Sequence, residues 1–389
     1  MATFIELSDI PVIDNHCHAV EALLSTDLAA WRERFTESPD PTIGAEHVSN
    51  SAFYRRLIRR MRDFYGIDDG SETEEELLAH RAELGTELLV EKLFRDANIG
   101  SVVIDTGYPA ADKAMKPADL VSASGSRYAA LLRLEVTFQT LIADSASYDE
   151  LVAAARDLVS DVRGAGYVGF KSIAAYRTGL AIDRWSDAEA REAFAGARAE
   201  VERTGAVRLG YKPLLDTLLH CAFEAAAEQE LPVQFHVGYG DPDVDIRAAS
   251  PLELRNLFEE PAYLGMPIVM LHGCWPYFRE GAYLAAVYRN AYLDISYSIP
   301  FLSAPEMTSM TRAALGTAPH SKVMYSSDAV GIPEMHWMGA IEGRKALGIT
   351  LGELVDFGEL SEDEARDAGE LILNANAARV YGLDGTDGP

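Results

Sequence analysis

Eight short apolar segments, rich in branched residues, recur along the chain and alternate with segments of helical periodicity. They are centred near residues 12, 102, 132, 168, 233, 268, 292 and 323. Runs of this kind are typical of strands buried in a parallel sheet, and intervening helices supply the crossover connections. We therefore predict an α/β protein, and eight such units predict a closed (β/α)8 TIM-type barrel. A doubly wound open sheet is the alternative.

The segments between the strands carry the expected helical pattern. From Tyr148 to Arg163, apolar residues recur every three or four positions, and Gly164 ends the pattern. The third apolar run is predicted to be a strand from Ala129 to Phe138. A last helix, from Asp363 to Tyr381, is predicted to close the chain.

The first strand is followed by a long polar region, residues 21–98, in which no strand is evident. Leu77, Leu84 and Leu88 lie at helical spacing, and Asn98 followed by Ile99 and Gly100 reads as a helix stop. We predict a helical insertion over the mouth of the barrel. The whole chain, residues 1–389, would then form a single domain.

Composition limits the partners and the compartment. A formal net charge of −27 argues against nucleic acid or an anionic membrane surface as a partner. The three cysteines, Cys17, Cys221 and Cys274, are too few and too scattered for a disulfide framework. The N-terminus lacks a basic and apolar leader pattern, and no apolar run reaches the roughly 18 residues of a membrane span. We expect a cytoplasmic protein that acts on a small molecule; a homo-oligomer is compatible with the sequence.

The first strand ends in two histidines one residue apart, within P-V-I-D-N-H-C-H-A-V. Because side chains alternate along a strand, His16 and His18 should face one way with Asp14, and Asn15 and Cys17 the other way. Neutral imidazoles are frequent ligands of zinc and similar metals. Taken alone, a His-x-His pair is a weak signal, since loops and satisfied core histidines also produce it.

Four further polar residues with metal-binding or ion-pairing chemistry follow later strands. They are Lys171, His236, His272 and Asp328. In a closed barrel the C-terminal ends of all strands surround one mouth, so residues far apart in sequence can meet there. An open sheet would spread them along an edge. Each histidine alone could be a satisfied structural residue, but the ordered set predicts a metal centre.

This ordered set resembles the amidohydrolase superfamily of metal-dependent barrel hydrolases, and the resemblance covers Pro11 to Leu383. Within that superfamily, F-K-S-I-A-A-Y-R-T-G-L (Phe170–Leu180) and F-H-V-G-Y-G-D-P-D-V-D (Phe235–Asp245) are similar to the amidohydrolase-like domain that some plant and fungal proteins carry fused to a glutamine synthetase-like domain. The resemblance implies that His16, His18 and Asp328 bind one metal ion, and that His236 and His272 bind a second.

Lys171, carboxylated by carbon dioxide, would bridge the two ions. Burial makes a lysine expensive to charge, and the neutral amine can form a carbamate. The alternative is an ammonium in an ion pair at the barrel mouth. If one metal binds, the implied ligands are His16, His18, His236 and Asp328, and His272 would orient or activate the water. We expect zinc, with manganese as the alternative.

The implied chemistry is hydrolysis of a carbon–nitrogen bond by metal-activated water. Asp328 would move the proton from the water to the leaving nitrogen. Loops after the strands should bind the substrate. The residues proposed for this are Tyr176, Arg177, Tyr239, Arg247, Trp275 and Tyr277. Arg177 or Arg247 could clamp a substrate carboxylate, although each could equally pair with a surface acid.

Three functions are compatible with the sequence. The favoured one is a metal-dependent amide hydrolase, with a γ-glutamyl amide or another small carboxylate-bearing amide as the substrate. The second is a metal-dependent decarboxylase of the same superfamily, although such relatives generally lack the lysine. The third is a non-catalytic barrel that binds a ligand; it predicts decay of the ligand set, which is complete here. Cys17 and Cys274 are expected to be packing residues.

Overall fold

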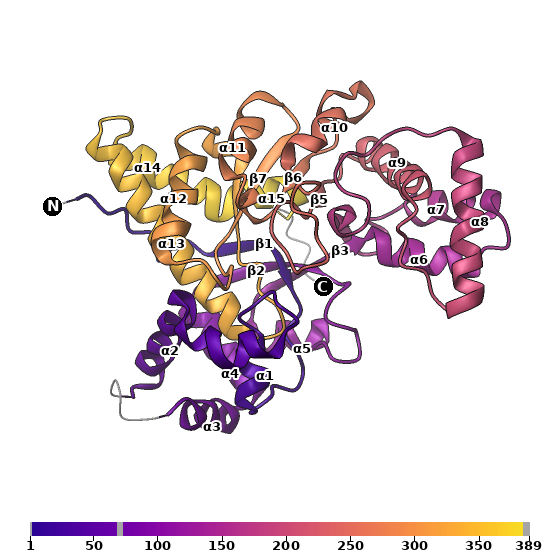
Figure 1. The fold of residues 1–389 in the computed structure, drawn as a ribbon. Coiled ribbons are helices and arrows are strands. Elements are labelled where there is room, and N and C mark those ends of the chain that lie inside the picture. The colour runs from indigo at the N-terminus through magenta and orange to yellow at the C-terminus, as the bar shows by residue number, and fades with distance from the viewer. Residues whose placement is uncertain (1, 68–72, 384–389) are drawn as a thin grey trace.

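Eight parallel strands form one sheet in the order in which they occur in the chain (Figure 1). The computed structural model describes residues 2–67 and 73–383. The strands are β1 (Val12–His18), β2 (Ile99–Asp105), β3 (Arg127–Arg133), β4 (Tyr167–Ser172), β5 (Val233–Phe235), β6 (Ile268–Met270), β7 (Ala291–Ser296) and β8 (Val323–Ser326).

The sheet closes between its first and last strands. The backbone N–H of Asp328 donates to the carbonyl of His16 (3.0 Å), and that of His18 donates to the carbonyl of Ala329 (2.8 Å). These two bonds join the end of β1 to the loop that follows β8. The prediction of a TIM-type barrel is confirmed, and the open sheet is excluded.

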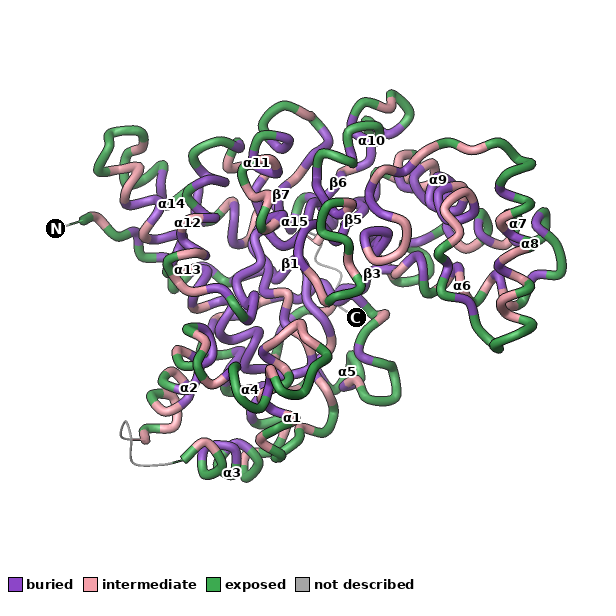
Figure 2. The backbone as a smooth tube through the Cα atoms, in the orientation of Figure 1, coloured by how far each residue is buried: buried purple, intermediate pink, exposed green. Residues whose placement is uncertain are grey.

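Helices surround the barrel, and Figure 2 shows that the strands are buried whereas the outer faces of the helices are exposed. After β2 these helices are α5 (Pro117–Ser124), α6 (Leu134–Asp144), α7 (Tyr148–Leu158), α8 (Asp187–Thr204), α9 (Lys212–Glu228), α10 (Arg255–Glu259), α11 (Phe278–Val287), α12 (Ala304–Leu315), α13 (Pro333–Asp356), α14 (Glu362–Glu370) and α15 (Asn376–Tyr381). Short single-turn helices occur in several loops.

Four α-helices of the described residues precede β2 and lie together on one side of the barrel (Figure 1). They are α1 (Leu28–Glu33), α2 (Ala52–Tyr65), α3 (Glu74–Leu84) and α4 (Thr86–Asp96). Side chains of Asp27, Ser51 and Thr73 cap the first three by accepting hydrogen bonds from free N–H groups in the first turn. A buried cluster of aromatic rings, including Trp31 and Tyr54, joins α1 to α2.

The barrel interior is apolar at its lower end and polar toward the mouth. Ile13, Val103, Leu131 and Val269 belong to one buried cluster that α15 covers through Tyr381. Above it, the hydroxyl of Tyr381 accepts a hydrogen bond from the Gln234 amide (2.7 Å). Layered filling of this kind makes the barrel a packed core and leaves its C-terminal rim for function.

The structure differs from the sequence-based predictions in three local features. The third strand ends at Arg133, because residues 134–138, assigned to the strand, form the first turns of α6. Helix α13, the longest helix of the described residues at 24 residues, was not predicted. Buried residues occur on nearly all sides of this helix, so its sequence lacks a simple amphipathic pattern.

The third difference concerns side-chain alternation along β1. A register shift lies between Asp14 and Cys17 in the pairing with β2. Asn15 therefore faces the interior, where its amide donates to Asp294 (2.6 Å), whereas Asp14 lies beside His336 of α13. The prediction that Asp14 shares a face with His16 and His18 was wrong, because one extra residue at a bulge reverses the alternation.

Over residues 2–67 and 73–383, no helix combines the length and the apolar character that a bilayer crossing would require.

Candidate metal centre

Six predicted side chains lie together at the C-terminal ends of the strands. They are His16, His18, Lys171, His236, His272 and Asp328. The Lys171 Nζ atom lies 3.0 Å from His16 Nε2, and His272 Nε2 lies 2.9 Å from His236 Nδ1. Asp328 is central: its carboxylate oxygens lie 3.0 Å from His272 Nδ1, 3.4 Å from His16 Nε2 and 3.8 Å from His18 Nε2.

An unusual backbone conformation directs two of these side chains toward the centre. Asp328 (φ +57°) and His272 (φ +62°) both adopt the left-handed conformation, immediately after their strands turn out of the barrel. This conformation is costly for a residue with a side chain and is found mainly where surrounding contacts enforce it. At Asp328 the hydrogen bond from its N–H to the carbonyl of His16 is one such contact.

Hydrogen bonds to neighbouring groups fix the orientation of the imidazoles. The Nδ1 atom of His18 lies 3.1 Å from the carbonyl oxygen of Tyr108, and Nε2 of His236 lies 2.6 Å from that of Tyr239. A histidine that donates one ring N–H to a carbonyl presents the other nitrogen as a lone pair. This leaves His18 Nε2 and His236 Nδ1 as ligand atoms that face the centre.

Burial keeps the imidazoles of His16 and His18 neutral. It lowers the pKa of His16 to about 4, with help from the nearby Lys171 ammonium, and that of His18 to about 3. Burial alone would raise the pKa of Asp328, but His272 and His16 outweigh it and hold that pKa well below its usual range. Neutral imidazoles and an ionised carboxylate are the protonation states that bind metal ions.

Lys171 is almost completely buried, and burial lowers the pKa of its amine to about 8 although Asp105 opposes the shift. Its Nζ atom lies 3.7 Å from Asp105 Oδ2. At pH 7 this pKa leaves roughly a tenth of the amine neutral, and the neutral form is a nucleophile toward carbon dioxide. The same contact with Asp105 would hold an ammonium if the amine stays protonated.

Asp105 and Arg133 join the site although sequence reasoning missed them. They end β2 and β3, and Arg133 Nε donates to Asp105 Oδ1 at 2.9 Å. A ligand atom of Asp105 lies within 4.8 Å of those of His16 and His18. The position at the end of a strand, which identified the other residues, would also have identified Asp105. Arg133 escapes this rule, because the third strand was predicted to continue to Phe138 and ends at Arg133 only in the structure.

A cavity of about 520 Å³ opens above the centre. Of the predicted substrate-binding residues, Tyr176, Arg177 and Tyr239 line it. Residues of the helical region before β2 line it as well, including Glu33 and Glu37. Burial and the nearby Asp328 raise the pKa of Glu37 to about 7. Nothing in the local sequence around Glu37 indicates a role, because only the tertiary fold brings it to the mouth.

The other three predicted substrate-binding residues do not line this cavity. Arg247 is exposed and paired with Asp245, its neighbour two positions earlier (2.8 Å). The indole of Trp275 donates to Glu306, and the hydroxyl of Tyr277 donates to the carbonyl of Ile246. Trp275 still packs against Tyr239, so it supports a cavity wall without forming it.

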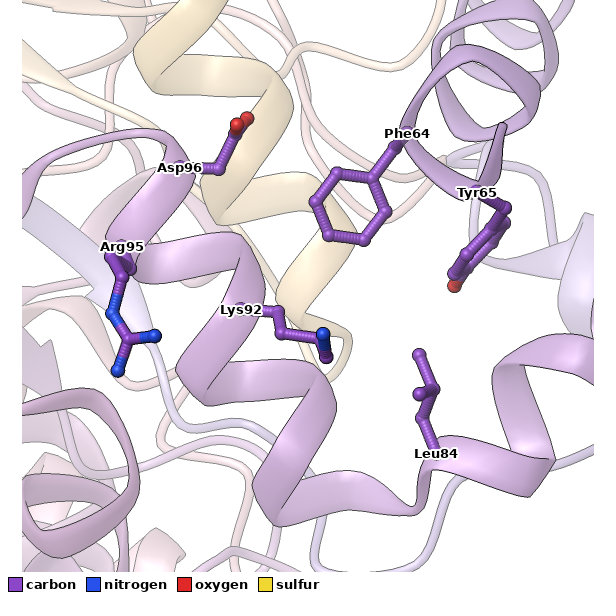
Figure 3. A pocket seen from close by; sticks show the side chains of 6 residues that line it. All are labelled: Phe64, Tyr65, Leu84, Lys92, Arg95 and Asp96. Atoms are coloured by element: carbon purple, nitrogen blue, oxygen red, sulfur yellow. The ribbon is translucent and has the colours of Figure 1, made fainter. Parts of the chain in front are cut away.

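A second hollow, of about 450 Å³, lies in the helical region before β2 (Figure 3). It is lined by Phe64, Tyr65, Leu84, Lys92, Arg95 and Asp96. The groups of potential metal ligands among the described residues include none of these six. Among the described residues, this hollow therefore has no candidate metal centre of its own.

The donor atoms at the mouth fit a divalent metal ion. His16, His272 and Asp328 each offer a ligand atom within 4.8 Å of the others, and His16, His18 and Asp105 form a second such group. His16 Nδ1 is buried without a hydrogen-bond partner. Two overlapping groups of nitrogen and oxygen donors are compatible with zinc or manganese, and they allow either one or two ions.

Comparisons with known proteins agree with this geometry. A model of the family described as Amidohydrolase matches residues 143–383. Protein fluG of Emericella nidulans is 31% identical over 235 residues, which make up 58% of this chain. The matched region is only 27% of the length of fluG, so most of that protein has no counterpart here.

Solved structures share the barrel. A protein of Lactobacillus casei ATCC 334 described as a metal-dependent hydrolase is 26% identical, with a TM-score of 0.86 over 97% of this chain and 96% of its own. Glucuronate isomerase of Caulobacter crescentus is 16% identical, with a TM-score of 0.65 over 98% of this chain and 93% of its own. At that identity the isomerase supports only the fold.

Proposed function

This chain belongs to the amidohydrolase family, and from that premise we propose that it hydrolyses a carbon–nitrogen amide bond in a small substrate that carries a carboxylate. The observation that carries the proposal is the position of Lys171. Its Nζ atom lies 3.0 Å from His16 Nε2, inside the histidine and aspartate cluster. A carbamate on that nitrogen would place an anionic bridge between the two groups of ligands.

In a two-metal arrangement, His16, His18 and Asp328 would hold one ion, His236 and His272 would hold the other, and carboxylated Lys171 would join them. In a one-metal arrangement, His16, His18, His236 and Asp328 would be the ligands. A bound divalent ion, zinc or manganese, supplies Lewis acidity that polarises the scissile carbonyl and makes water a better nucleophile. Asp105 and Arg133 keep the charge around Lys171 and His18 balanced.

Asp328 moves the proton. Its Oδ2 atom accepts a hydrogen bond from the Tyr239 hydroxyl (2.8 Å) and lies 3.0 Å from His272 Nδ1. Burial, with Asp328 nearby, raises the pKa of Tyr239 well above its usual range, so this hydroxyl stays protonated and keeps donating. Asp328 accepts the proton of the attacking water and returns it to the leaving nitrogen, and in the one-metal arrangement His272 orients the water.

Charged side chains in the cavity support an amide that bears ionic groups. Arg177 lines the cavity, and its Nε atom is buried without a hydrogen-bond partner. It can therefore form a new charge-assisted bond with a substrate carboxylate. Glu37 and Asp241 line the same cavity and suit an ammonium group. A γ-glutamyl amide carries both groups, in keeping with the resemblance to domains fused to a glutamine synthetase-like domain.

The experiment is an assay of metal-free protein reloaded with zinc or manganese. γ-Glutamyl amides should release free amine and glutamate. In parallel, small carboxylic acids are tested for release of carbon dioxide. Release of amine supports the proposal. Release of carbon dioxide without amine, together with one metal ion per chain, would instead identify a decarboxylase, and turnover of neither class would favour a non-catalytic binding protein.

A lysine variant tests the carbamate separately. Lys171→Ala should lose activity, and a short-chain carboxylate such as acetate should restore part of it by occupying the space of the carbamate. Lys345→Ala is the control, because Lys345 is exposed on α13. Full activity of Lys171→Ala without added carboxylate would contradict the bridging role.

A further inference from the structure

A third group of potential metal ligands lies on the other side of β1, away from the cavity. It consists of Asp14, Cys17 and His336, and one ligand atom of each lies within 4.8 Å of the other two. All three are buried: Asp14 and Cys17 are 0% exposed and His336 is 1% exposed. Oxygen, sulfur and nitrogen donors therefore meet between β1 and the first turn of α13.

The bulge in β1 creates this group. In a regular strand, residues three apart face opposite sides, so Asp14 and Cys17 would point in opposite directions. The register shift between them reverses the alternation and turns both toward α13. Neighbouring His16 and His18 face the barrel mouth. One strand thus carries ligand-type side chains on both faces.

His336 provides the independent sign of a ligand. Neither of its ring nitrogens has a hydrogen-bond partner, although the ring is buried. Its Nδ1 atom points at Asp14 but remains 3.6 Å from Oδ2, beyond a good hydrogen bond. Buried polar groups are rarely left unpaired, because the loss of water is then not compensated. A cation between the imidazole and the carboxylate would compensate it.

We propose that Asp14, Cys17 and His336 bind a zinc-like divalent cation in a structural site separate from the centre at the barrel mouth. The charges balance: the Asp14 carboxylate and a Cys17 thiolate neutralise a divalent ion, and the neutral imidazole of His336 adds no charge. Binding releases the thiol proton of Cys17 to solvent. Each residue offers one ligand atom, an oxygen, a sulfur and a nitrogen, and these are the donor types that bind zinc in proteins.

The surroundings hold the donors in place. Asp14 accepts hydrogen bonds from the N–H of Ser327 (2.8 Å) and from its hydroxyl (2.5 Å). The ring of Phe94 packs against His336 with the ring centres 5.2 Å apart. Outer contacts of this kind orient ligands in metal sites. A bound ion would tie β1 to α13, and thus the barrel to its longest helix.

The test uses cobalt, because only the site proposed here contains a sulfur ligand. Full-length protein, stripped of metal and kept under reducing conditions, is titrated with Co²⁺. Only a thiolate ligand produces a sulfur-to-cobalt charge-transfer band in the near ultraviolet, and the centre at the mouth contains no cysteine among its proposed ligands. The wild type should show this band, and its Co²⁺ capacity should exceed that of Cys17→Ser by one ion per chain.

Matched variants identify the residue that produces the charge-transfer band. Cys17→Ser should abolish it, and His336→Gln should weaken Co²⁺ binding at this site by at least tenfold. Cys221→Ser, which removes another buried free cysteine on α9, should leave the band intact. A wild-type protein that binds Co²⁺ without this band would overturn the proposal, as would a band that persists in Cys17→Ser. The proposed hydrolase activity has no part in either outcome.

Discussion

Three histidines at the barrel mouth illustrate how burial prepares a side chain for metal chemistry. Burial is the largest cause that lowers the pKa of His16, His18 and His236, so these rings are neutral over the whole physiological range. Asp328 remains ionised in the same surroundings because His272 and His16 stabilise its charge. Neutral and anionic donors therefore coexist within a few ångströms, and none of these three imidazoles or the Asp328 carboxylate has to lose a proton before a cation binds.

His236→Ala should abolish activity and metal retention together. His236 is a proposed ligand, and its loss should lower metal affinity by more than the roughly 10–100-fold that removal of an outer hydrogen-bond partner costs. Metal content per chain after dialysis and kcat/KM give the two readouts. The control is His47→Ala, which alters an exposed histidine. Full metal occupancy in the His236 variant would show that the ligand assignment is wrong.

Glu37 should make the metal-free protein less stable as pH rises. Its pKa is raised from the usual 4.5 to about 7, so between these values the folded state binds a proton that the unfolded state does not. The free energy of unfolding attributable to Glu37 must therefore fall as pH increases from about 4.5 through 7. Urea unfolding at several pH values should show this decline in the wild type and a flatter profile in Glu37→Gln.

The comparison for Glu37 is Glu202→Gln, an exposed residue of α8. This variant should follow the wild-type pH profile. If the Glu37 and Glu202 variants give the same pH dependence, the raised pKa of Glu37 is not a property of the folded protein.

At the scale of elements, the sequence predicted those features that repeat and missed those that depend on neighbours. The apolar runs identified all eight strands, because burial on both faces leaves a nearly continuous apolar pattern. The same pattern misplaced the end of β3, since residues 134–138 are apolar enough for either a strand or a buried helix. The bulge in β1 and the buried helix α13 arise from tertiary contacts, and neither has a periodic signature.

Helices α3 and α13 are joined by a buried ion pair. Arg81, 2% exposed, donates two hydrogen bonds to Glu334, which is fully buried in the first turn of α13. Arg81→Met would leave the Glu334 carboxylate buried without its partner, which should cost about 3–5 kcal/mol of unfolding free energy. Chemical denaturation measures this loss. The double variant Arg81→Met with Glu334→Leu should recover most of it, because no uncompensated charge remains.

An exposed pair provides the control for Arg81. Arg95 and Glu91 pair within α4, with side chains 74% and 39% exposed. Arg95→Met should therefore cost less than about 1 kcal/mol. Equal losses of unfolding free energy for Arg81→Met and Arg95→Met would mean that burial does not determine the contribution of the Arg81–Glu334 pair to stability.

At the scale of the whole molecule, closure of the barrel turns scattered residues into one site. The ends of β1, β4, β5, β6 and β8 meet only because β8 returns to β1. This is why strand-end positions in the sequence sufficed to bring six ligand candidates together. Arg177 followed from the same rule, whereas Glu37 did not. Glu37 comes from the helical region before β2, and its approach to the mouth depends on how that region packs.

The seam between β1 and β8 should control how firmly Asp328 is held. Ser327 donates from its N–H and its hydroxyl to Asp14, and the same hydroxyl accepts from the N–H of Ala329 (3.0 Å). Ser327→Ala removes the hydroxyl bonds from a buried site and should cost about 1–3 kcal/mol. Hydrogen exchange should become faster at the amides of Asp328 and His18, whose bonds close the barrel, and should remain unchanged along β2 and β3.

Ser126→Ala is the control that distinguishes an effect on the β1–β8 seam from the loss of any buried serine hydroxyl. Ser126 is 2% exposed, and its hydroxyl donates to the carbonyl of Ile99 (2.6 Å) at the opposite end of the strands. The Ser126→Ala variant should lose a similar amount of unfolding free energy and keep slow hydrogen exchange at the amides of Asp328 and His18. Because Asp328 has a left-handed backbone that its surroundings must enforce, loosening the seam should also lower metal affinity in Ser327→Ala alone. Unchanged exchange at Asp328 in Ser327→Ala would show that the two backbone bonds hold the seam without the serine.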